Sequence, residues 1–178
     1  MEDGQRPPNG RSKDELRLVI VAGSAGAGPE AVPEMINHAL TVLADLLEEG
    51  DLACEFSLVS GSLIDGDVAE SVNALLPSLC RVQGLQWVQS WRTPVGDALP
   101  GLFLPTRQAD AWGQGAPARA LVDSLTYWVM ALMGRLWPDD AECWSLTVET
   151  DDWYAAAYVD VVINHQEQVW LLHLGVTD

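Results

Sequence analysis

Lysine is nearly absent from this chain: of nine basic residues only Lys13 is a lysine, against 26 aspartates and glutamates. The formal net charge of −17 repels nucleic acid phosphates and anionic lipids. It therefore argues against direct binding to DNA, RNA or membranes. The same charge speeds the encounter with a basic protein. Solubility alone also explains an acidic surface, so composition leaves both interpretations open.

Cysteine is scarce as well. Cys54, Cys80 and Cys143 are far apart and form no Cys-x-x-Cys pair. An odd, widely spaced set of this kind is not a disulfide or zinc framework. We expect the three thiols to act as small hydrophobic side chains in a reducing compartment.

Uninterrupted membrane-length apolar segments are also missing. Residues 120–137 have the required length, but Asp123, Ser124 and Arg135 interrupt them. A buried amphipathic helix is the better interpretation of that stretch. Because the first 15 residues are polar, no secretory signal is predicted, and we expect a cytoplasmic protein without membrane contact.

Motifs for phosphate, metal or cofactor binding are lacking too. The glycine-rich turn at residues 23–28 fits neither a dinucleotide-binding fingerprint nor a P-loop. His38, His165 and His173 stand in no His-x-x-x-His or Glu-x-x-His spacing. The sequence therefore predicts no metal ion and no cofactor, and it contains no recognisable family motif.

What the sequence does contain is a clear β-pattern near its C-terminal end. Three runs rich in β-branched and aromatic residues span 142–150, 153–165 and 168–174. Short polar pairs, Asp151-Asp152 and Gln166-Glu167, separate them and are typical of two-residue hairpin turns. The pattern predicts an antiparallel meander with the run 153–165 in the middle.

The two predicted turns fix the register of this meander. The first turn sets Trp144, Leu146 and Val148 opposite Val159, Ala157 and Ala155. The second sets Ile163, Val161 and Val159 opposite Trp170, Leu172 and Leu174. In this register the apolar residues of all three strands share one face, and we expect that face to be buried.

The remaining elements follow from turn residues and apolar spacing. In chain order we predict a flexible tail at 1–14, a strand at 16–22, a helix from Pro29 to about Glu49, a strand at 52–58, a helix at 67–79, a broken region at 81–117 and a helix at 118–137. The apolar face of the first helix consists of Val32, Ile36, Ala39, Leu40, Leu43, Leu46 and Leu47. The last helix is expected to pack through Leu121, Leu125, Trp128, Leu132 and Leu136. The expected fold is a single α+β domain over 15–178. It is a two-layer sandwich with a mixed, mostly antiparallel sheet of about five strands and helices on one face.

The other sheet face is predicted to be polar. The predicted distances between its side chains show whether they could form a catalytic triad. The register sets Asp160 directly opposite His173, within reach of a charge-assisted contact. Ser145 is instead expected opposite Tyr158, two strands away from His173. That separation is roughly 10 Å, too far for a serine–histidine hydrogen bond. A catalytic triad of Ser145, His173 and Asp160 is therefore rejected, and no catalytic residue is assigned.

A partner-binding face around the first hairpin is the most concrete functional prediction. Its residues are Glu149, Asp151, Asp152, Trp153, Tyr154, Tyr158, Asp160 and His173. Carboxylates would steer a basic partner, while rigid aromatics supply contact area at low entropic cost. A simple turn beside a solvated face is the alternative. The tryptophan-rich composition, eight in all, makes the region between Trp87 and Trp112 the next choice for an interface.

Two classes of function remain open from the sequence. The first is a non-catalytic acidic protein that docks onto a basic partner and neutralises it, such as an immunity protein or inhibitor of a toxin or nuclease, a nucleic-acid mimic, or a secretion or assembly chaperone. The second is a small-molecule enzyme with a pocket under the 81–117 region. A monomer and a homodimer through the open sheet face are both compatible with the sequence.

Overall fold

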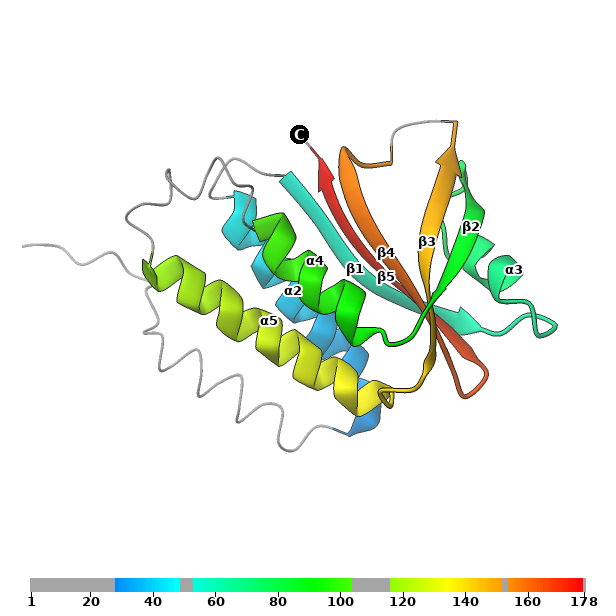
Figure 1. Cartoon of the computed structure of the whole chain (residues 1–178), viewed down its shortest axis with the longest axis horizontal. Coiled ribbons are helices and arrows are strands. Elements are labelled where there is room, and N and C mark those ends of the chain that lie inside the picture. The colour runs from blue at the N-terminus through cyan, green and yellow to red at the C-terminus, as the bar shows by residue number, and fades with distance from the viewer. Residues whose placement is uncertain (1–27, 49–52, 104–115, 152–153, 178) are drawn as a thin grey trace, which may run out of the picture.

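An antiparallel sheet is the centre of the structure, a computed structural model that describes residues 28–48, 53–103, 116–151 and 154–177. The five strands lie in the order β1-β5-β4-β3-β2 (Figure 1). They are β1 (Ala53–Ser62), β2 (Cys80–Val88), β3 (Glu142–Thr150), β4 (Ala157–His165) and β5 (Gln168–Thr177). The predicted α+β class, a sheet of about five strands and the C-terminal meander are thereby confirmed, although β2 takes a place in the sheet that was not predicted for it.

The helices cover the sheet unequally. They are α2 (Val32–Glu48), preceded by a 3-10 turn η1 (Pro29–Ala31), α3 (Val68–Asn73), α4 (Arg92–Phe103) and α5 (Ala116–Leu136). Helices α2, α4 and α5 form one layer against one face of the sheet, as Figure 1 shows. Short α3 is the exception, because it packs on the opposite face against β2 and β5. None of the helices in these ranges is long and apolar enough to cross a membrane.

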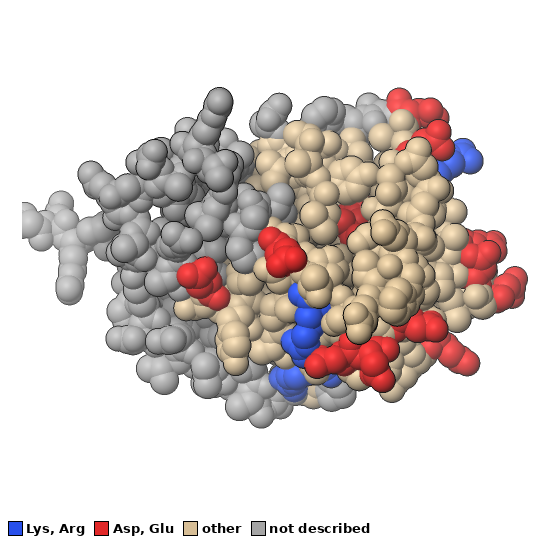
Figure 2. Space-filling model, viewed as in Figure 1, with Lys and Arg blue, Asp and Glu red and all other residues tan. Residues whose placement is uncertain are grey.

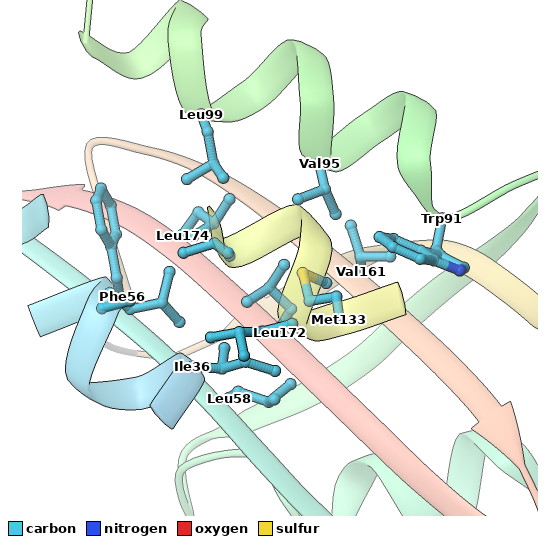
Figure 3. Packing of buried hydrophobic residues seen from close by; sticks show 14 of the residues in the cluster. Ile36, Phe56, Leu58, Trp91, Val95, Leu99, Met133, Val161, Leu172 and Leu174 are labelled. Atoms are coloured by element: carbon cyan, nitrogen blue, oxygen red, sulfur yellow. The ribbon is translucent and has the colours of Figure 1, made fainter. Parts of the chain in front are cut away.

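The main hydrophobic core lies between the three-helix layer and the sheet (Figure 3). Its helical side includes Ile36 of α2, Val95 and Leu99 of α4, and Met133 of α5, all with no exposed surface. Its sheet side is formed by Phe56, Leu58, Val161, Ile163, Leu172 and Leu174. The buried face predicted for the first helix is confirmed, since Val32, Ile36, Ala39, Leu40 and Leu43 are all fully buried.

The second predicted hairpin is correct in register. Val159, Val161 and Ile163 of β4 pair with Leu174, Leu172 and Trp170 of β5. The turn residues Gln166 and Glu167 have φ angles of 53° and 62°. Positive φ at both central positions is the requirement of a type I′ turn, which matches the twist of a two-residue hairpin.

The first predicted hairpin is wrong in register. Trp144 pairs with Val162 and Leu146 with Asp160, because β4 begins at Ala157 and the connection from β3 is longer than two residues. The shift is an odd number of residues, so it turns β3 over. Trp144, Leu146 and Val148 therefore pack in a second cluster with α3, and Cys143 faces the main core instead.

That second cluster covers part of the sheet face predicted to be polar. Val72 and Leu76, from α3 and the turn after it, pack against Val162 of β4 and Val169 and Leu171 of β5. Helix α3 is shorter than the predicted 67–79 segment. Asp67 caps its start by accepting hydrogen bonds from two backbone amides of its first turn. Its end precedes Pro77, which disfavours helical backbone in the residue before it.

The described part of the region predicted to be broken is largely regular. Residues 80–88 form β2 and 92–103 form α4, although the helix contains Pro94 and Pro100. Trp91, just before α4, is fully buried and donates its indole N–H to the carbonyl of Pro138 at 3.0 Å. Trp87 on β2 is 62% exposed. The predicted tail, the strand at 16–22 and Trp112 lie outside the described residues.

The last predicted helix is confirmed, and its contact face is wider than predicted. Leu125 and Leu132 of α5 are buried, while Trp128 and Leu136 are partly buried and pack against the main core. Val129 and Met133, which were not predicted, are fully buried on the same side. Trp137 follows the helix and packs edge-to-face against Trp91 and Trp170, with ring centroids 5.8 and 5.5 Å apart.

Candidate functional site

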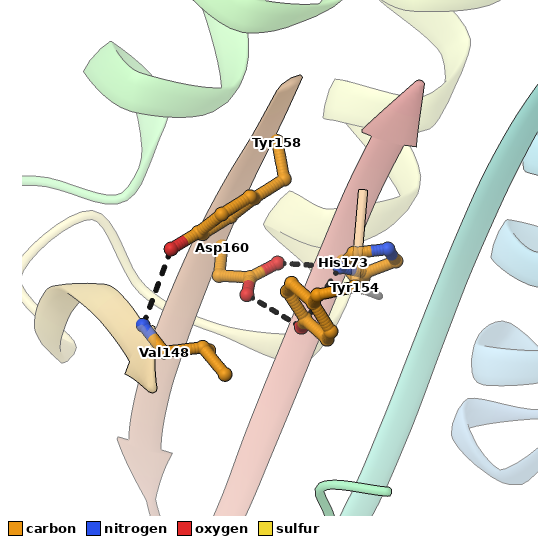
Figure 4. A network of polar contacts seen from close by, with 5 residues as sticks. All are labelled: Val148, Tyr154, Tyr158, Asp160 and His173. Atoms are coloured by element: carbon orange, nitrogen blue, oxygen red, sulfur yellow. Dashed lines mark hydrogen bonds and ion pairs between the residues drawn. The ribbon is translucent and has the colours of Figure 1, made fainter. Parts of the chain in front are cut away.

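Asp160 and His173 form a buried pair on the sheet face opposite the main core. They are cross-strand neighbours on β4 and β5, as predicted, and Asp160 Oδ1 lies 2.6 Å from His173 Nδ1. Tyr154 donates its hydroxyl to the other carboxylate oxygen, Oδ2, at 2.7 Å (Figure 4). Only 2% of Asp160 and 8% of His173 is exposed. The contact predicted for Asp160 and His173 is confirmed, but within the protein interior.

The hydrogen bonds orient the imidazole. An ionised carboxylate only accepts, so Nδ1 of His173 must donate to Asp160. The tyrosine oxygen lies 3.1 Å from the same nitrogen and can share that hydrogen. In the neutral ring this leaves Nε2 as an acceptor. Burial, and then the neighbouring Asp160 carboxylate, raise the pKa of Tyr154, so the phenol stays a neutral donor.

A second tyrosine, Tyr158, packs beside this network. Tyr158 packs its ring edge-to-face on Tyr154, with centroids 5.0 Å apart, and its hydroxyl accepts a hydrogen bond from the Val148 amide at 3.2 Å. The β3–β4 pairing ends at Leu146, so the hydroxyl takes the place of a missing backbone acceptor. Tyr154 also packs on the His173 ring at 4.9 Å.

A cavity of about 560 Å³ opens beside the network. We call it the His173 cavity; it lies between β1, β5 and the 75–80 segment that joins α3 to β2. Its polar lining residues are Glu55, Ser57, Ser78, Thr150, Tyr154, His173 and Thr177. Its apolar lining residues are Val59, Leu75, Leu76, Pro77, Leu79, Cys80 and Leu171. A lining that contains both kinds of residue suits a ligand that is polar at one end.

Gly175 keeps space for the imidazole. It lies two residues after His173 on the same face of β5, and a Cβ there would overlap Nε2 of His173. Its cross-strand partner on β1 is Glu55, and that of His173 is Ser57. The edge strand β1 therefore brings a carboxylate and a hydroxyl to the side of the imidazole that faces away from Asp160.

The row Ser57, His173, Asp160 has the order of a nucleophile, a base and an orienting carboxylate. Within the part of the chain that the structure describes, however, no hydrogen bond joins Ser57 to His173. Strand β5 is also paired on both sides, so its amides serve the ladders and not an oxyanion. We assign no catalysis to this row. Ser145 pairs with Val161 and lies outside the network.

The predicted partner-binding residues divide into three groups. Glu149 and Asp151 are exposed near the end of β3, while Tyr154 and Tyr158 are partly buried. Asp160 and His173 are buried, and His173 lines the cavity. Asp152 and Trp153 lie outside the described residues. Whether this set binds a partner stays a prediction.

Charge is distributed unevenly over the surface. Every Asp and Glu side chain whose exposure the structure describes is exposed, with the exception of Asp160, whereas the basic side chains so described are Arg81, Arg92 and Arg135. Many carboxylates stand at the end of the sheet where β1 and β4 finish and β3 and β5 begin. We call this group the acidic end: Asp65, Asp67, Glu70, Asp139, Asp140, Glu142 and Glu167. Figure 2 shows carboxylates along the right-hand and lower margins of the molecule, with few arginines among them.

Contacts within the acidic end link its segments. The Leu63 amide donates to the Glu167 carbonyl at 2.8 Å, and Asn164 donates its side-chain amide to Glu142 at 2.8 Å. Arg92 pairs with Asp139 at 2.5 Å. Over the described ranges, no group of three or more His, Cys, Asp or Glu side chains is arranged to hold a metal ion.

Comparisons with models of known protein families, with characterised proteins and with solved structures find no match for this chain. The site must therefore be interpreted from its own geometry and charge.

Proposed function

We propose that this chain is a non-catalytic acidic protein-binding domain, which docks onto a basic protein and neutralises it. One observation carries the proposal: exposed carboxylates far outnumber exposed basic groups throughout the described surface. Proteins that bind nucleic acid present positive surfaces to phosphates. A dense array of carboxylates is complementary to such a surface, so a nuclease or another nucleic-acid-binding toxin is the class of partner it fits. An immunity protein or inhibitor acts in this way.

The acidic end is the docking region that the charge distribution favours. It collects carboxylates from the β1–α3 connection, the start of β3 and the β4–β5 turn. Each region holds one arginine, since Arg92 pairs with Asp139 in the acidic end and Arg81 on β2 stands opposite Glu149 near the predicted hairpin face. The hairpin face remains the second region to test, because Tyr154 and Tyr158 are partly exposed there.

Three sets of neutralising substitutions separate these regions. The first set, Glu70→Gln, Asp140→Asn and Glu167→Gln, removes three charges from the acidic end without touching the helix cap Asp67. The second set is Glu149→Gln, Asp151→Asn and Asp152→Asn. A matched control removes three charges from exposed positions on α2 and α5: Glu34→Gln, Asp45→Asn and Asp123→Asn.

The measurement is the association rate with the basic protein that the immobilised chain retains from its own cell extract and that is then purified. We expect the wild-type rate to fall roughly tenfold or more between about 20 and 200 mM NaCl. The acidic-end set should slow association several-fold at low salt, and the control set should change it much less. Equal effects of all three sets, or a partner that is not basic, would contradict the proposal.

A further inference from the structure

We propose that the His173 cavity binds a small organic cation, an ammonium group carried on an apolar chain. The inference rests on the chemistry of the cavity wall and not on docking at the acidic end, so either proposal can fail without the other. Binding inside the cavity would use polar groups that the docking proposal leaves without a role, among them Glu55, Ser57 and the Nε2 atom of His173.

The charge of the wall selects a cation. Glu55 is the charged side chain at the cavity surface, and no lysine or arginine is among the described residues that line it. Directly behind His173 lies the buried carboxylate of Asp160. Because Asp160 is paired with His173, Glu55 is the carboxylate that an entering ligand would meet, so an anion would be repelled and an ammonium group attracted.

The hydrogen-bonding groups also match an ammonium donor. Asp160 contacts Nδ1 of His173, which leaves Nε2 on the side toward Gly175, and in the neutral form of the ring with its hydrogen on Nδ1 this atom is an acceptor. Ser57 is the cross-strand neighbour of His173, and Glu55 is that of Gly175. An imidazole nitrogen, a hydroxyl oxygen and a carboxylate thus stand on adjacent positions of β1 and β5. An ammonium has three N–H donors, and these groups are acceptors for them.

The apolar residues of the cavity lining explain why the cation should carry an apolar chain. Leu79 is 54% exposed and Val59 39% exposed, and both border the cavity together with Leu75 and Pro77. A ligand that covers apolar side chains and removes them from water lowers the free energy of the complex. Each methylene buried there should strengthen binding about fourfold, since it contributes about 0.8 kcal/mol.

The direct test uses three probes with the same six-carbon chain, n-hexylamine, 1-hexanol and hexanoate, titrated into the full chain at neutral pH. Binding is followed by calorimetry and by the NMR signals of the His173 ring. We expect hexylamine to bind at least tenfold more tightly than hexanol, and hexanoate not to saturate. Hexanoate binding as tightly as hexylamine would overturn the proposal.

Variants then locate the site. Glu55→Gln removes the carboxylate from an exposed position on β1 and should weaken hexylamine binding about fivefold or more, with little effect on hexanol. Glu34→Gln, an equally exposed carboxylate on α2, is the matched control and should change neither. If both variants reduce hexylamine binding equally, the effect is general charge and the cavity is not the site.

A second variant tests the imidazole without removing it. In Gly175→Ala the added Cβ must displace the ring, so hexylamine binding should be lost while Asp160 and His173 are both retained. Two sources of the ligand are then compared: n-hexylamine represents a free amine, and Nα-acetyl-lysine methylamide represents a lysine side chain of a protein. The tighter probe identifies the source, and failure of both to bind at millimolar concentration overturns the inference.

Discussion

Cys143 shows how a single residue responds to the corrected orientation of β3. Its side chain is fully buried in the main core, where the thiol contacts the Val88 carbonyl at 3.7 Å. Burial raises the pKa of Cys143 from 9.0 to about 11, because the thiolate would be formed away from water. The thiol is therefore a stable neutral group in the folded protein, in keeping with its predicted role as a small hydrophobic side chain.

This pKa predicts how the stability depends on alkaline pH. The folded-state pKa lies above the unfolded value, so the contribution of Cys143 is fully present below pH 9 and is lost as the pH rises toward 11. The free energy of unfolding should fall by on the order of 2 kcal/mol more in the wild type than in Cys143→Ala over this interval. Urea unfolding of both proteins at pH 8, 9, 10 and 11 measures the difference. Parallel pH profiles would show that the thiol ionises as easily in the folded state.

Among the elements, the β4–β5 hairpin is defined by a turn with an unfavourable sequence. Gln166 and Glu167 both have positive φ, a conformation in which side chains with a Cβ are strained and Asn or Gly is preferred. Gln166→Asn combined with Glu167→Gly should raise the free energy of unfolding by about 1 kcal/mol. Glu167→Gln, which removes the same charge and keeps the Cβ, is the control and should give a smaller gain. Urea denaturation at neutral pH decides, and an unchanged or lower stability would exclude a type I′ strain.

The same hairpin explains which strand pairings the sequence could predict. Between β4 and β5 the alternation continues up to both turn residues, so the turn length and the register are determined together. Between β3 and β4, Asp151-Asp152 resembles a tight turn, but the strand resumes only at Ala157. Small residues at 155–157 fit a loop and a strand equally well, so alternation did not reveal the odd-numbered shift.

Helix α4 was missed for a different physical reason. Proline and glycine at 94, 96, 100 and 101 are strong breakers in isolated peptides. Here Pro94 lies in the first turn, where its missing N–H costs little. Burial of Trp91, Val95 and Leu99 stabilises the segment against the main core. The spacing of four between these three residues is visible in the sequence. The prolines and glycines nevertheless favoured the prediction of a broken region over that of a helix.

The candidate site could be predicted only where its residues share a hairpin. Asp160 and His173 were placed opposite each other because one short turn joins their strands. Tyr154 reaches the network from the β3–β4 connection, whereas the predicted two-residue turn placed this residue within a strand. Glu55 and Ser57 lie beside His173 because β1 pairs with β5. A pairing between segments so distant in the chain leaves no local pattern in the sequence from which it could be predicted.

For the whole molecule, the net charge of −17 sets a repulsive energy that the fold must withstand. Charge far from zero destabilises the compact state, and salt screens that repulsion. Raising NaCl from about 10 to 300 mM should therefore increase the free energy of unfolding by on the order of 1 kcal/mol. Urea titrations at several salt concentrations measure it. A stability independent of NaCl would mean that the exposed carboxylates are too far apart to repel one another.

The acidic-end set of substitutions, Glu70→Gln, Asp140→Asn and Glu167→Gln, tests where this repulsion is concentrated. If these carboxylates crowd one end of the sheet, removing three of them should stabilise the protein at low salt and reduce its response to NaCl. The control set on α2 and α5 should do so to a smaller extent. These carboxylates would then lower the stability of the fold while making no contact in its core. If the acidic-end set also loses association with the partner, binding explains why the carboxylates lie together at this end. Equal stabilisation by both sets would mean that the charge is spread evenly, and would remove the basis for placing the docking region at this end.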